Sequence, residues 1–451
     1  MQNDLTKQNV TKSILFFTLP IFLGNVFQQF YNMVDTIIVG QFVGTNALAG
    51  VGSTGTIMFL IFGLVSGMTL GFTVLTSQRY GANDLQGVHE SIKSAVILNG
   101  IITLIMTIIC IVFMKPLLHL MQTPMETFDY AYDYIIIISY GIVAQVAYNY
   151  LSCLLRGLGD SKTPLYFLVL SAGLNIILDY LLVAVIPLGT AGAAIATVIS
   201  QLIAAIASFA YIMNKVKLLH FNWHHTVTNK DYMLRQLMVG IPMALQYSIT
   251  AIGTTMIQVA LNMLGPIYMA AYTSASKIEQ LVTQAYGALG TTMATFAAQN
   301  IGANDIKRVK QGFKSAAIIG YIYGIVFGFL MALYGKYFTS LFVSENVEVL
   351  MGYVDIYLKW CALFLIPLTI VNVYRNGIQG LGYGFMPMLA GIAELVGRGI
   401  VAIIGINIAS YSFICLNGPF AWSFAEIVLL IVYHKIINDL AMQYKSNVTS
   451  K

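Results

Sequence analysis

Charged residues are scarce in this chain, and their scarcity excludes an ordinary water-soluble protein. Of the 451 residues, 9% are charged and 58% are hydrophobic. Soluble domains carry roughly 25% charged residues, because their surfaces face water. A surface so poor in charge is expected to face lipid. The net charge of +5 comes from basic residues between apolar runs rather than from one patch, so we expect no nucleic-acid partner.

Cysteines and catalytic motifs are also scarce. The four cysteines (Cys110, Cys153, Cys361 and Cys415) lie in or near apolar segments without CxxC spacing. We therefore interpret them as small apolar side chains, not as disulfides or metal ligands. The sequence contains no HExxH, GxSxG or Walker A motif. These absences argue against an intramembrane enzyme and against ATP-driven pumping, so we expect no enzymatic activity and no cofactor.

Long apolar runs recur along the whole chain at near-regular intervals. A helix needs about 20 residues to cross roughly 30 Å of hydrocarbon. The runs predict an all-α integral membrane protein with twelve transmembrane helices. The expected spans are 14–38, 47–76, 93–114, 131–154, 164–186, 191–213, 236–263, 268–298, 315–338, 351–374, 386–409 and 418–437.

The distribution of basic residues predicts the orientation of these spans. With both termini in the cytoplasm, 18 of the 23 Lys and Arg residues lie in cytoplasmic segments, and only Lys115 and Lys336 lie in outer loops. The other three (Lys277, Lys359 and Arg398) fall within spans. Cytoplasmic loops of membrane proteins are enriched in Lys and Arg. We therefore expect a multi-pass protein of the cell membrane with both termini inside.

The sequence contains an internal repeat. Gly81-Ala82-Asn83-Asp84 recurs 221 residues later as Gly302-Ala303-Asn304-Asp305, and Leu19-Pro20 recurs at nearly the same offset as Ile241-Pro242. This common spacing predicts a duplication. We expect an amino-terminal six-helix lobe over 1–214, a cytoplasmic linker over 215–234 and a carboxy-terminal lobe over 235–451. Lobes repeated about an axis along the membrane normal are typical of alternating-access transporters.

Polar side chains within the first span form one stripe. Asn25, Gln28, Asn32 and Asp35 are spaced by three or four residues, which places them on one helix face. Ionisable groups in spans are costly and mark functional sites. We interpret Asp35 as a functional residue, while the amides also fit a polar seam between packed helices.

Further oxygen ligands lie in the fifth and sixth spans. Asn175 and Asp179 are one helical turn apart, and Thr197 follows the small-residue run Gly192-Ala193-Ala194. Together with Asp35 they would make a set of oxygen atoms suited to Na⁺ or, without metal, to a proton. Two acids close together in low dielectric cannot both ionise cheaply. We predict a cation site at Asp35, Asn175, Asp179 and Thr197, if these helices meet.

The second half carries a different set of polar residues. We assign Gln28, Asn32, Gln246, Gln258 and Glu279 to a substrate pathway. Glu394 and Arg398 are spaced as a favourable helical ion pair that is structural or functional.

The order of several motifs resembles the multidrug and toxic compound extrusion (MATE) family over nearly the whole chain. The motifs are Leu19-Pro20, Asp35-Thr36-Ile37-Ile38-Val39-Gly40, Ala47-Leu48-Ala49-Gly50-Val51-Gly52, Gly81-Ala82, Arg156-Gly157-Leu158-Gly159-Asp160 before Pro164, and Leu174-Asn175-Ile176-Ile177-Leu178-Asp179. The resemblance implies two six-helix lobes in a V and export of drugs or toxins coupled to entry of Na⁺ or H⁺.

The same resemblance implies roles for individual residues. Asp35, Asn175, Asp179 and Thr197 match the amino-terminal cation site of the DinF-like branch, and Pro20 matches the proline where the first helix bends. The NorM-like branch has an acid in its seventh helix, where this chain has Thr250. This departure favours the DinF-like branch.

We therefore expect a monomeric secondary antiporter that exports small organic compounds, cationic or amphipathic, in exchange for Na⁺ or H⁺. The main alternative is a flippase of the same superfamily that moves a lipid-linked head group. Such a protein would be expected to have several cationic side chains facing its cleft, and only Lys277, Lys359 and Arg398 are available. A major facilitator transporter also has six plus six spans, but its basic signature is absent from the loop between Gln78 and Lys93.

Overall fold

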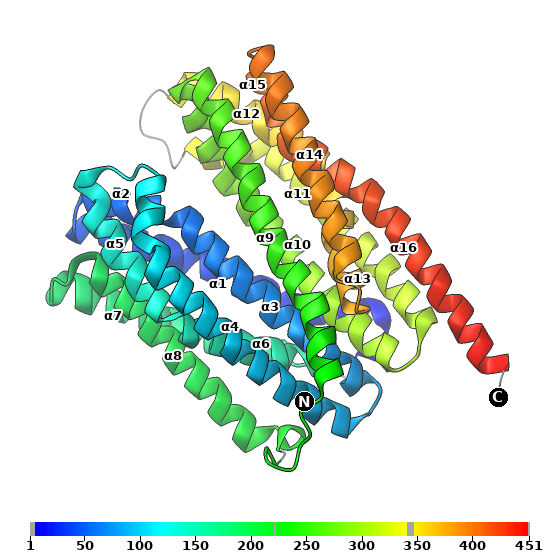
Figure 1. Ribbon diagram of the computed structural model, residues 1–451. Helices are drawn as coiled ribbons and strands as arrows, with labels where there is room; N and C mark the ends of the chain where they lie inside the picture. Colours follow the sequence, from blue (N-terminus) through cyan, green and yellow to red (C-terminus); the bar gives the residue numbers. More distant parts are fainter. Residues whose placement is uncertain (1–4, 221, 341–346, 450–451) are drawn as a thin grey trace. The chain divides into compact units, whose positions relative to one another are not determined.

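A computed structural model describes residues 5–220, 222–340 and 347–449. Residues 1–4 and 450–451, at the ends of the two predicted lobes, and residue 221 of the predicted linker lie outside the described residues. The described chain forms helices joined by short loops, without strands (Figure 1). In chain order the helices are α1 (Val10–Phe42), α2 (Thr45–Ser53), α3 (Gly55–Gly81), α4 (Leu85–Leu120), α5 (Met125–Tyr140), α6 (Ile142–Gly157), α7 (Lys162–Asp179), the π-helix η1 (Tyr180–Val185), α8 (Gly189–Lys215), the 3₁₀ helix η2 (Lys217–Leu219), α9 (Lys230–Leu264), α10 (Pro266–Gly302), α11 (Ile306–Ser340), α12 (Val347–Leu363), α13 (Leu365–Gly380), α14 (Phe385–Asn407), α15 (Tyr411–Cys415) and α16 (Asn417–Thr449).

The long helices are consistent with the predicted count of twelve spans. Within the described residues, nine helical segments are long and apolar enough to cross a membrane singly. Two more spans are helix pairs bent by more than 40°, α5 with α6 and α12 with α13. The remaining long helix is α10, which covers the predicted eighth span but is less apolar than the others.

The two halves of the chain repeat the same backbone features. The bends in the two helix pairs are 52° and 51°, and they lie at Gly141 and Phe364, equivalent places in the repeat. Gly44 and Gly265, 221 residues apart, both have positive φ (115° and 125°) at the start of the next helix. Asn83 and Asn304 in the two GAND turns have φ of 56° and 59°. Positive φ is rare for non-glycine residues, so the shared angles support the duplication.

The contacts divide the chain into two compact units. Unit 1 contains residues 23–244, and unit 2 contains residues 4–22 and 245–451. The predicted lobe boundaries at 214 and 235 differ from this division at two places. The first turns of α1, up to Phe22, belong to unit 2, and the first turns of α9, up to Ala244, belong to unit 1. Pro20 and Pro242 lie within these helices, two residues before each change of unit.

Unit 1 contains α2 to α8, most of α1 and the start of α9. The predicted second span is divided in the structure into α2 and α3, which are separated by Thr54. The largest cores of this unit lie between α3, α4 and α6 and between α3, α4 and α5. Small residues allow α3 to approach α9 closely at Gly67 and Gly71.

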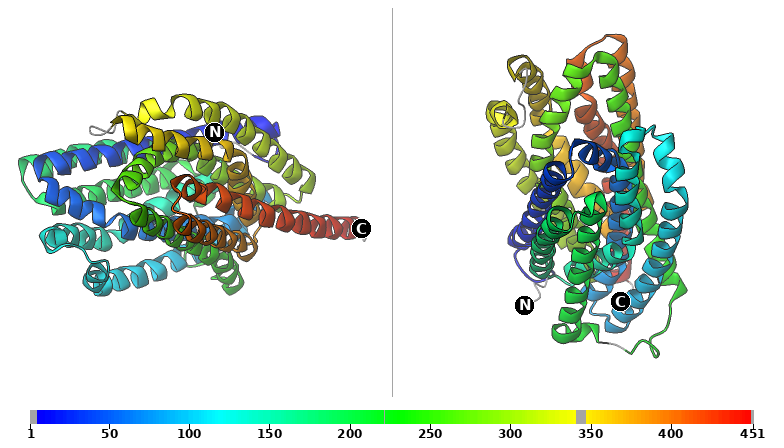
Figure 2. Two further views of the ribbon diagram at one scale, coloured as in Figure 1. Left: turned by 90° about the horizontal axis from the view of Figure 1, so that it is seen from above. Right: turned by 90° about the vertical axis from the view of Figure 1, so that its left-hand side faces the viewer.

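Unit 2 is built around α10, α11, α12 and α13, with α14 and α16 side by side. Its core also includes Val10, Ile14 and Phe17 from the first turns of α1. Arg308 of α11 donates hydrogen bonds to the backbone carbonyls of Leu5 and Gln8, which fixes the chain just before α1. The carboxy-terminal part of α16 extends beyond the other helices of this unit (Figures 1 and 2).

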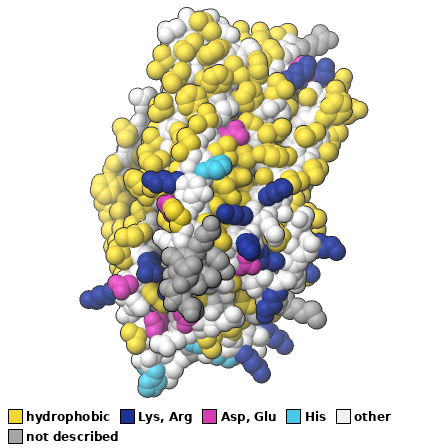
Figure 3. All heavy atoms as spheres, turned by 90° about the vertical axis from the view of Figure 1, so that its right-hand side faces the viewer, with side chains coloured by type: hydrophobic (Ala, Val, Ile, Leu, Met, Phe, Trp, Pro, Cys, Tyr) yellow, Lys and Arg dark blue, Asp and Glu magenta, His cyan; other side chains and the backbone are white. Residues whose placement is uncertain are grey.

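Much of the exposed surface is apolar. Large hydrophobic side chains such as Leu104, Ile108 and Val112 on α4 are more than half exposed. On the face shown in Figure 3, hydrophobic side chains predominate and most Lys and Arg side chains gather toward one end. This surface fits a protein in contact with lipid. Three of the free cysteines are buried and Cys110 is half-buried, as expected for small apolar side chains.

Candidate cation site in unit 1

Three helices of unit 1 carry the four predicted cation ligands. Asp35 lies in α1, Asn175 and Asp179 lie in the last turn of α7, and Thr197 lies in α8. Asp179 is the last α-helical residue before the π-helix η1. π-helical turns are rare and are often found at functional sites.

The structure brings these four residues together. The carboxyl groups of Asp35 and Asp179 are close enough to interact with each other. Asn175 Nδ2 lies 3.4 Å from Thr197 Oγ1, and Thr197 Oγ1 donates to the carbonyl of Ala193 at 3.1 Å. Asn175 lies one turn before Asp179 on α7, so the amide and the hydroxyl lie next to the acid pair.

The oxygen atoms of this site lack hydrogen-bond donors. Among the described residues, Asp35 Oδ1, Asn175 Oδ1 and both carboxylate oxygens of Asp179 are buried without a hydrogen-bond partner. Asp179 is fully buried and Asn175 is 2% exposed. Buried polar atoms in proteins are almost always satisfied. These four oxygen atoms are acceptors that a proton or a cation can satisfy.

The surroundings of the acids are apolar and tightly packed. Ile38 and Val39 of α1 pack against Val183 of η1 and Ala193 of α8. Gly192 allows α8 to lie against η1, because a Cβ at this position would be 2.7 Å from the carbonyl oxygen of Leu182. Asp179 is fully buried, whereas Asp35 is half-buried next to exposed residues of α1. Electrostatic interactions are stronger where water is excluded, as around Asp179.

Two tyrosines that were not predicted lie near the acid pair. Tyr31, one turn before Asp35 on α1, and Tyr134 of α5 both interact electrostatically with Asp35 and Asp179. Tyr31 falls four residues before Asp35, so helical spacing alone would have identified it. No comparable signal links Tyr134 to the site, because α5 is distant in sequence.

The predicted pathway residues are divided between the two units. In unit 1, Gln28 and Asn32 are exposed on α1. In unit 2, Gln258 is exposed on α9 and its Nε2 lies 2.9 Å from Met269 Sδ of α10. Gln246 and Glu279 are half-buried. Glu279 Oε2 accepts a hydrogen bond from Tyr357 Oη at 3.4 Å.

The predicted pair between Glu394 and Arg398 is not the one that forms. Glu394 instead forms an ion pair with Arg375 of α13. Arg398 Nη1 donates to Asn417 Oδ1 at 3.4 Å, and Asn417 Nδ2 donates back to the carbonyl of Arg398. Helical spacing cannot reveal a partner on another helix, and here the partners come from α13 and α16.

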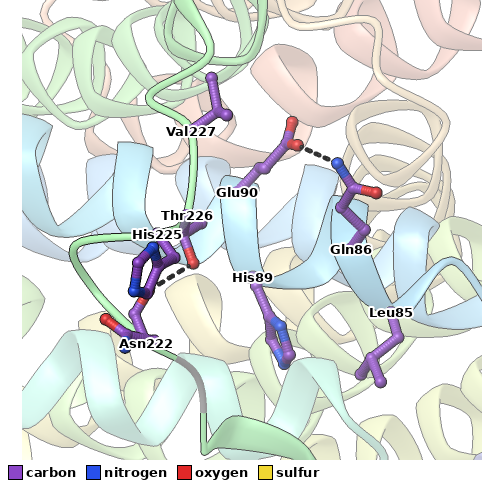
Figure 4. Close-up of a pocket in the computed structure, with 8 residues that line it drawn as sticks. All are labelled: Leu85, Gln86, His89, Glu90, Asn222, His225, Thr226 and Val227. Atoms are coloured by element: carbon purple, nitrogen blue, oxygen red, sulfur yellow. Dashed lines mark hydrogen bonds between the residues drawn. The ribbon is translucent and has the colours of Figure 1, made fainter.

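A cavity of about 470 Å³ lies on unit 1 between the start of α4 and the segment before α9 (Figure 4). His89, Glu90 and His225 are among its lining residues. His89 Nε2 is 2.8 Å from the carbonyl of Leu218, and Glu90 Oε2 accepts from Asn229 Nδ2. The segment before α9 is therefore hydrogen-bonded to α4. Among the described residues, no group of three His, Cys, Asp or Glu side chains is arranged to hold a metal.

Lys93 of α4 also contacts this segment. Its Nζ donates to the carbonyls of Trp223 and Thr226 at 2.9 and 2.8 Å and lies 5.3 Å from the centre of the Trp223 ring. The predicted linker is thus held by unit 1.

Comparison with known proteins identifies relatives over most of the chain. The family model MatE matches twice, over residues 20–181 and 242–404, which confirms the internal repeat. A probable multidrug resistance protein of Bacillus subtilis, YpnP, is 32% identical over 83% of both chains. A second one from the same organism, YoeA, is 28% identical over 76% of this chain and 75% of its own. The outward-facing structure of a multidrug resistance MATE family transporter superposes with a TM-score of 0.91, at 22% identity, over 97% of this chain and 98% of that one.

Proposed function

Because the chain belongs to the MatE family, we propose that it is a secondary antiporter that exports small organic compounds in exchange for Na⁺ or H⁺. Its relatives are named as multidrug resistance proteins and not as enzymes. The chain is a multi-pass membrane protein for multidrug export, with small molecules as its substrates. The coupling ion, the polarity of the substrate and the DinF-like branch belong to the proposal.

The four unsatisfied oxygen atoms around Asp35 and Asp179 are the observation that supports ion coupling. Leaving such atoms buried without a partner is costly, and more so for carboxylates. A proton or Na⁺ between the two carboxyl groups would neutralise one charge and satisfy several acceptors. An oxygen-only ligand set of this kind suits an alkali cation or a proton.

The first helix offers a route from ion binding to movement of the substrate. Its residues up to Phe22 belong to unit 2, whereas Asp35 belongs to unit 1. Pro20 removes a backbone hydrogen bond within α1, and proline is the commonest cause of a helix kink. We propose that ion uptake at Asp35 and Asp179 changes the bend of α1 and releases substrate outside. Release of the ion inside then restores the binding-competent form.

The remaining parts of the proposal are the location of the termini, the oligomeric state and the choice against a flippase. The bias of Lys and Arg supports a cytoplasmic location for both termini in the cell membrane. We propose a monomer as the working unit, since one chain contains both lobes of the repeat. The flippase alternative requires several cationic side chains in the pathway. Of the three that the spans offer (Lys277, Lys359 and Arg398), Lys359 is paired with Asp355 and Arg398 is hydrogen-bonded to Asn417.

Transport by the purified protein in proteoliposomes tests the proposal. A fluorescent organic cation would be loaded, and export would be measured under a Na⁺ gradient alone and a pH gradient alone. Asp35→Asn keeps the shape of the side chain but removes its charge, and we expect at least a tenfold loss of gradient-driven export. Asp129→Asn, which changes an exposed carboxylate of α5, is the matched control and should transport at the parental rate.

The outcomes are distinct. Export driven by one gradient and lost in Asp35→Asn supports the mechanism and identifies the coupling ion. Export by Asp35→Asn at the parental rate would rule out coupling through this site. Export by the parent at the same rate with and without an imposed Na⁺ or pH gradient would rule out antiport coupled to either ion.

A further inference from the structure

The start of α1 lies against the start of α11 within unit 2. Arg308 of α11 donates hydrogen bonds to the backbone carbonyls of Leu5 and Gln8, just before α1. Thr11 Oγ1 of α1 donates to Ser315 Oγ of α11 at 3.1 Å. These contacts follow one another in the same order along both segments, so the two helices run in the same direction where they touch.

Beyond this contact, each helix has an exposed lysine followed by exposed apolar side chains. We call these residues the α1–α11 face: Lys12, Leu15 and Leu19 of α1 and Lys314, Ile318 and Ile325 of α11. Leu15 is 50% exposed and Ile325 is 61% exposed. The spacings within each helix are three, four or seven residues, which keep the side chains on one side of that helix.

The two lysines lie on the same side of the helix pair. Successive residues of an α-helix are about 100° apart around its axis. Lys12 follows the contact residue Thr11, whereas Lys314 precedes the contact residue Ser315. In neighbouring helices that run in the same direction, these opposite steps turn both side chains toward the same side. The two ammonium groups are therefore placed to bind one ligand.

This end of unit 2 is strongly basic. Neither residues 5–22 nor α11 contains an acidic residue. The first nine positions of α11 carry four basic residues, Lys307, Arg308, Lys310 and Lys314. The nearby Asp305 accepts the backbone N–H of Arg308. Within the part of the chain that the structure describes, Lys12 and Lys314 form no ion pair and no side-chain hydrogen bond.

The counterpart of Lys314 in the repeat has partners within the protein. This counterpart is Lys93, 221 residues earlier, whose ammonium group donates to the carbonyls of Trp223 and Thr226. In unit 2 the carbonyls of the segment before α1 are bound by Arg308 instead. The same place in the repeat therefore holds the linker in unit 1 and presents an exposed ammonium group in unit 2.

A lipid head group fits this surface better than a soluble anion does. Exposed leucine and isoleucine side chains of a membrane protein face acyl chains. A phosphodiester is negatively charged and accepts charge-assisted hydrogen bonds from lysine. A single lysine at the end of a span commonly extends to the interface without a specific ligand. Here two helices place their lysines on the same side, each directly before an apolar face, so a phosphate and an acyl chain can be bound together.

We propose that the α1–α11 face binds an anionic phospholipid, with its phosphate between Lys12 and Lys314 and an acyl chain along the exposed leucine and isoleucine side chains. Basic residues next to a membrane span attract anionic lipids. The bound lipid would lie on the part of α1 that belongs to unit 2. Its binding depends neither on the coupling ion nor on the exported compound.

Binding of two lipids with identical acyl chains tests the proposal. Phosphatidylglycerol is anionic, and phosphatidylcholine is zwitterionic. The dissociation constant of the first bound lipid would be measured by native mass spectrometry of the purified protein in a neutral detergent. Lys12→Gln with Lys314→Gln removes both charges, and Lys12→Arg with Lys314→Arg keeps them. Lys162→Gln with Lys230→Gln is the control, which removes two exposed lysines at the starts of helices in unit 1.

We expect the parent to bind phosphatidylglycerol at least tenfold more tightly than phosphatidylcholine. The double glutamine variant at Lys12 and Lys314 should bind phosphatidylglycerol about tenfold or more weakly than the parent, since each basic residue near an anionic membrane surface contributes about fivefold to affinity. The double arginine variant and the control should bind it within about twofold of the parent. Without lipid, all variants should unfold at the parental temperature.

Three results would overturn the site: equal affinity of the parent for the two lipids, unchanged binding of phosphatidylglycerol by the double glutamine variant, or an equal loss in the control. A competition with inorganic phosphate separates a lipid from a free anion. Displacement of phosphatidylglycerol by an equal concentration of phosphate would show that the acyl chains contribute nothing and would overturn a lipid ligand.

Discussion

The contact between α3 and α9 in unit 1 makes a strong prediction about packing. Gly67 and Gly71 of α3 lie against Gly240 and Ala244 of α9. Small residues four apart on two membrane helices allow their backbones to touch. A Cβ at Gly71 would lie 2.4 Å from Gly240 Cα, and one at Gly67 would lie 2.6 Å from Ala244 Cα.

These distances determine the cost of adding one methyl group. Carbon atoms in contact are normally separated by about 3.5–4.0 Å. Gly71→Ala therefore requires the two backbones to separate by more than an ångström, because the atom in the way belongs to the backbone and cannot rotate aside. Overpacking of this kind destabilises a protein by about 1–3 kcal/mol. We expect Gly71→Ala to lower the free energy of unfolding by an amount within this range.

The assay is thermal unfolding of the purified protein in detergent, with Gly100→Ala as the control. Gly100 is also helical, in α4, but a Cβ there would have no atom within 4 Å. The control should unfold at the parental temperature or slightly above, since alanine favours the helix. Gly71→Ala should unfold at a clearly lower temperature and should also reduce transport, because α9 would shift in unit 1. Equal unfolding temperatures for the two variants would show that α3 and α9 do not touch as described.

Two further predictions concern the predicted linker and the two helices that pass from one unit to the other. Lys93→Met removes two hydrogen bonds that hold the linker on α4. We therefore expect limited proteolysis within residues 216–229 to become several times faster. The control is Lys162→Met, which replaces an exposed lysine at the start of α7 and should leave the rate of proteolysis unchanged. Pro20→Ala and Pro242→Ala each restore a backbone hydrogen bond in a helix that passes from one unit to the other. We expect each variant to lose at least fivefold in export with little loss of thermal stability. Export at the parental rate by both variants would show that these prolines have no part in the mechanism.

The spans were predictable from hydropathy, but their breaks were not. Long apolar runs indicate where helices cross a membrane, because lipid requires each span to bury its own backbone polar groups. Thr54, Gly141 and Phe364 interrupt or bend helices within the predicted second, fourth and tenth spans. The breaks depend on packing between helices, which hydropathy does not record. The same applies to η1, whose sequence Tyr180–Val185 is simply apolar.

The candidate cation site was predictable where its residues share a helix face. Asn175 and Asp179 are one turn apart, and charge within a span made Asp35 conspicuous. That α1 and α7 bring their carboxyl groups together is a tertiary fact that the sequence only permitted. Tyr134 and the ion pair of Glu394 with Arg375 were missed for the same reason.

The two halves of the repeat share backbone features but differ in the polar and charged residues on their helix faces. Gly44 and Gly265 retain the same unusual φ, since a side chain at either position would strain the turn. The side chains on helix faces are less constrained than the residues of these turns. The residue that corresponds to Asp35 in the repeat is Ile257, which is 2% exposed in the core of unit 2, while Lys277 has no basic counterpart on α3. The side chains on one helix face can therefore differ between the two copies of a duplicated membrane unit, because each such substitution leaves the turns that define the fold unchanged.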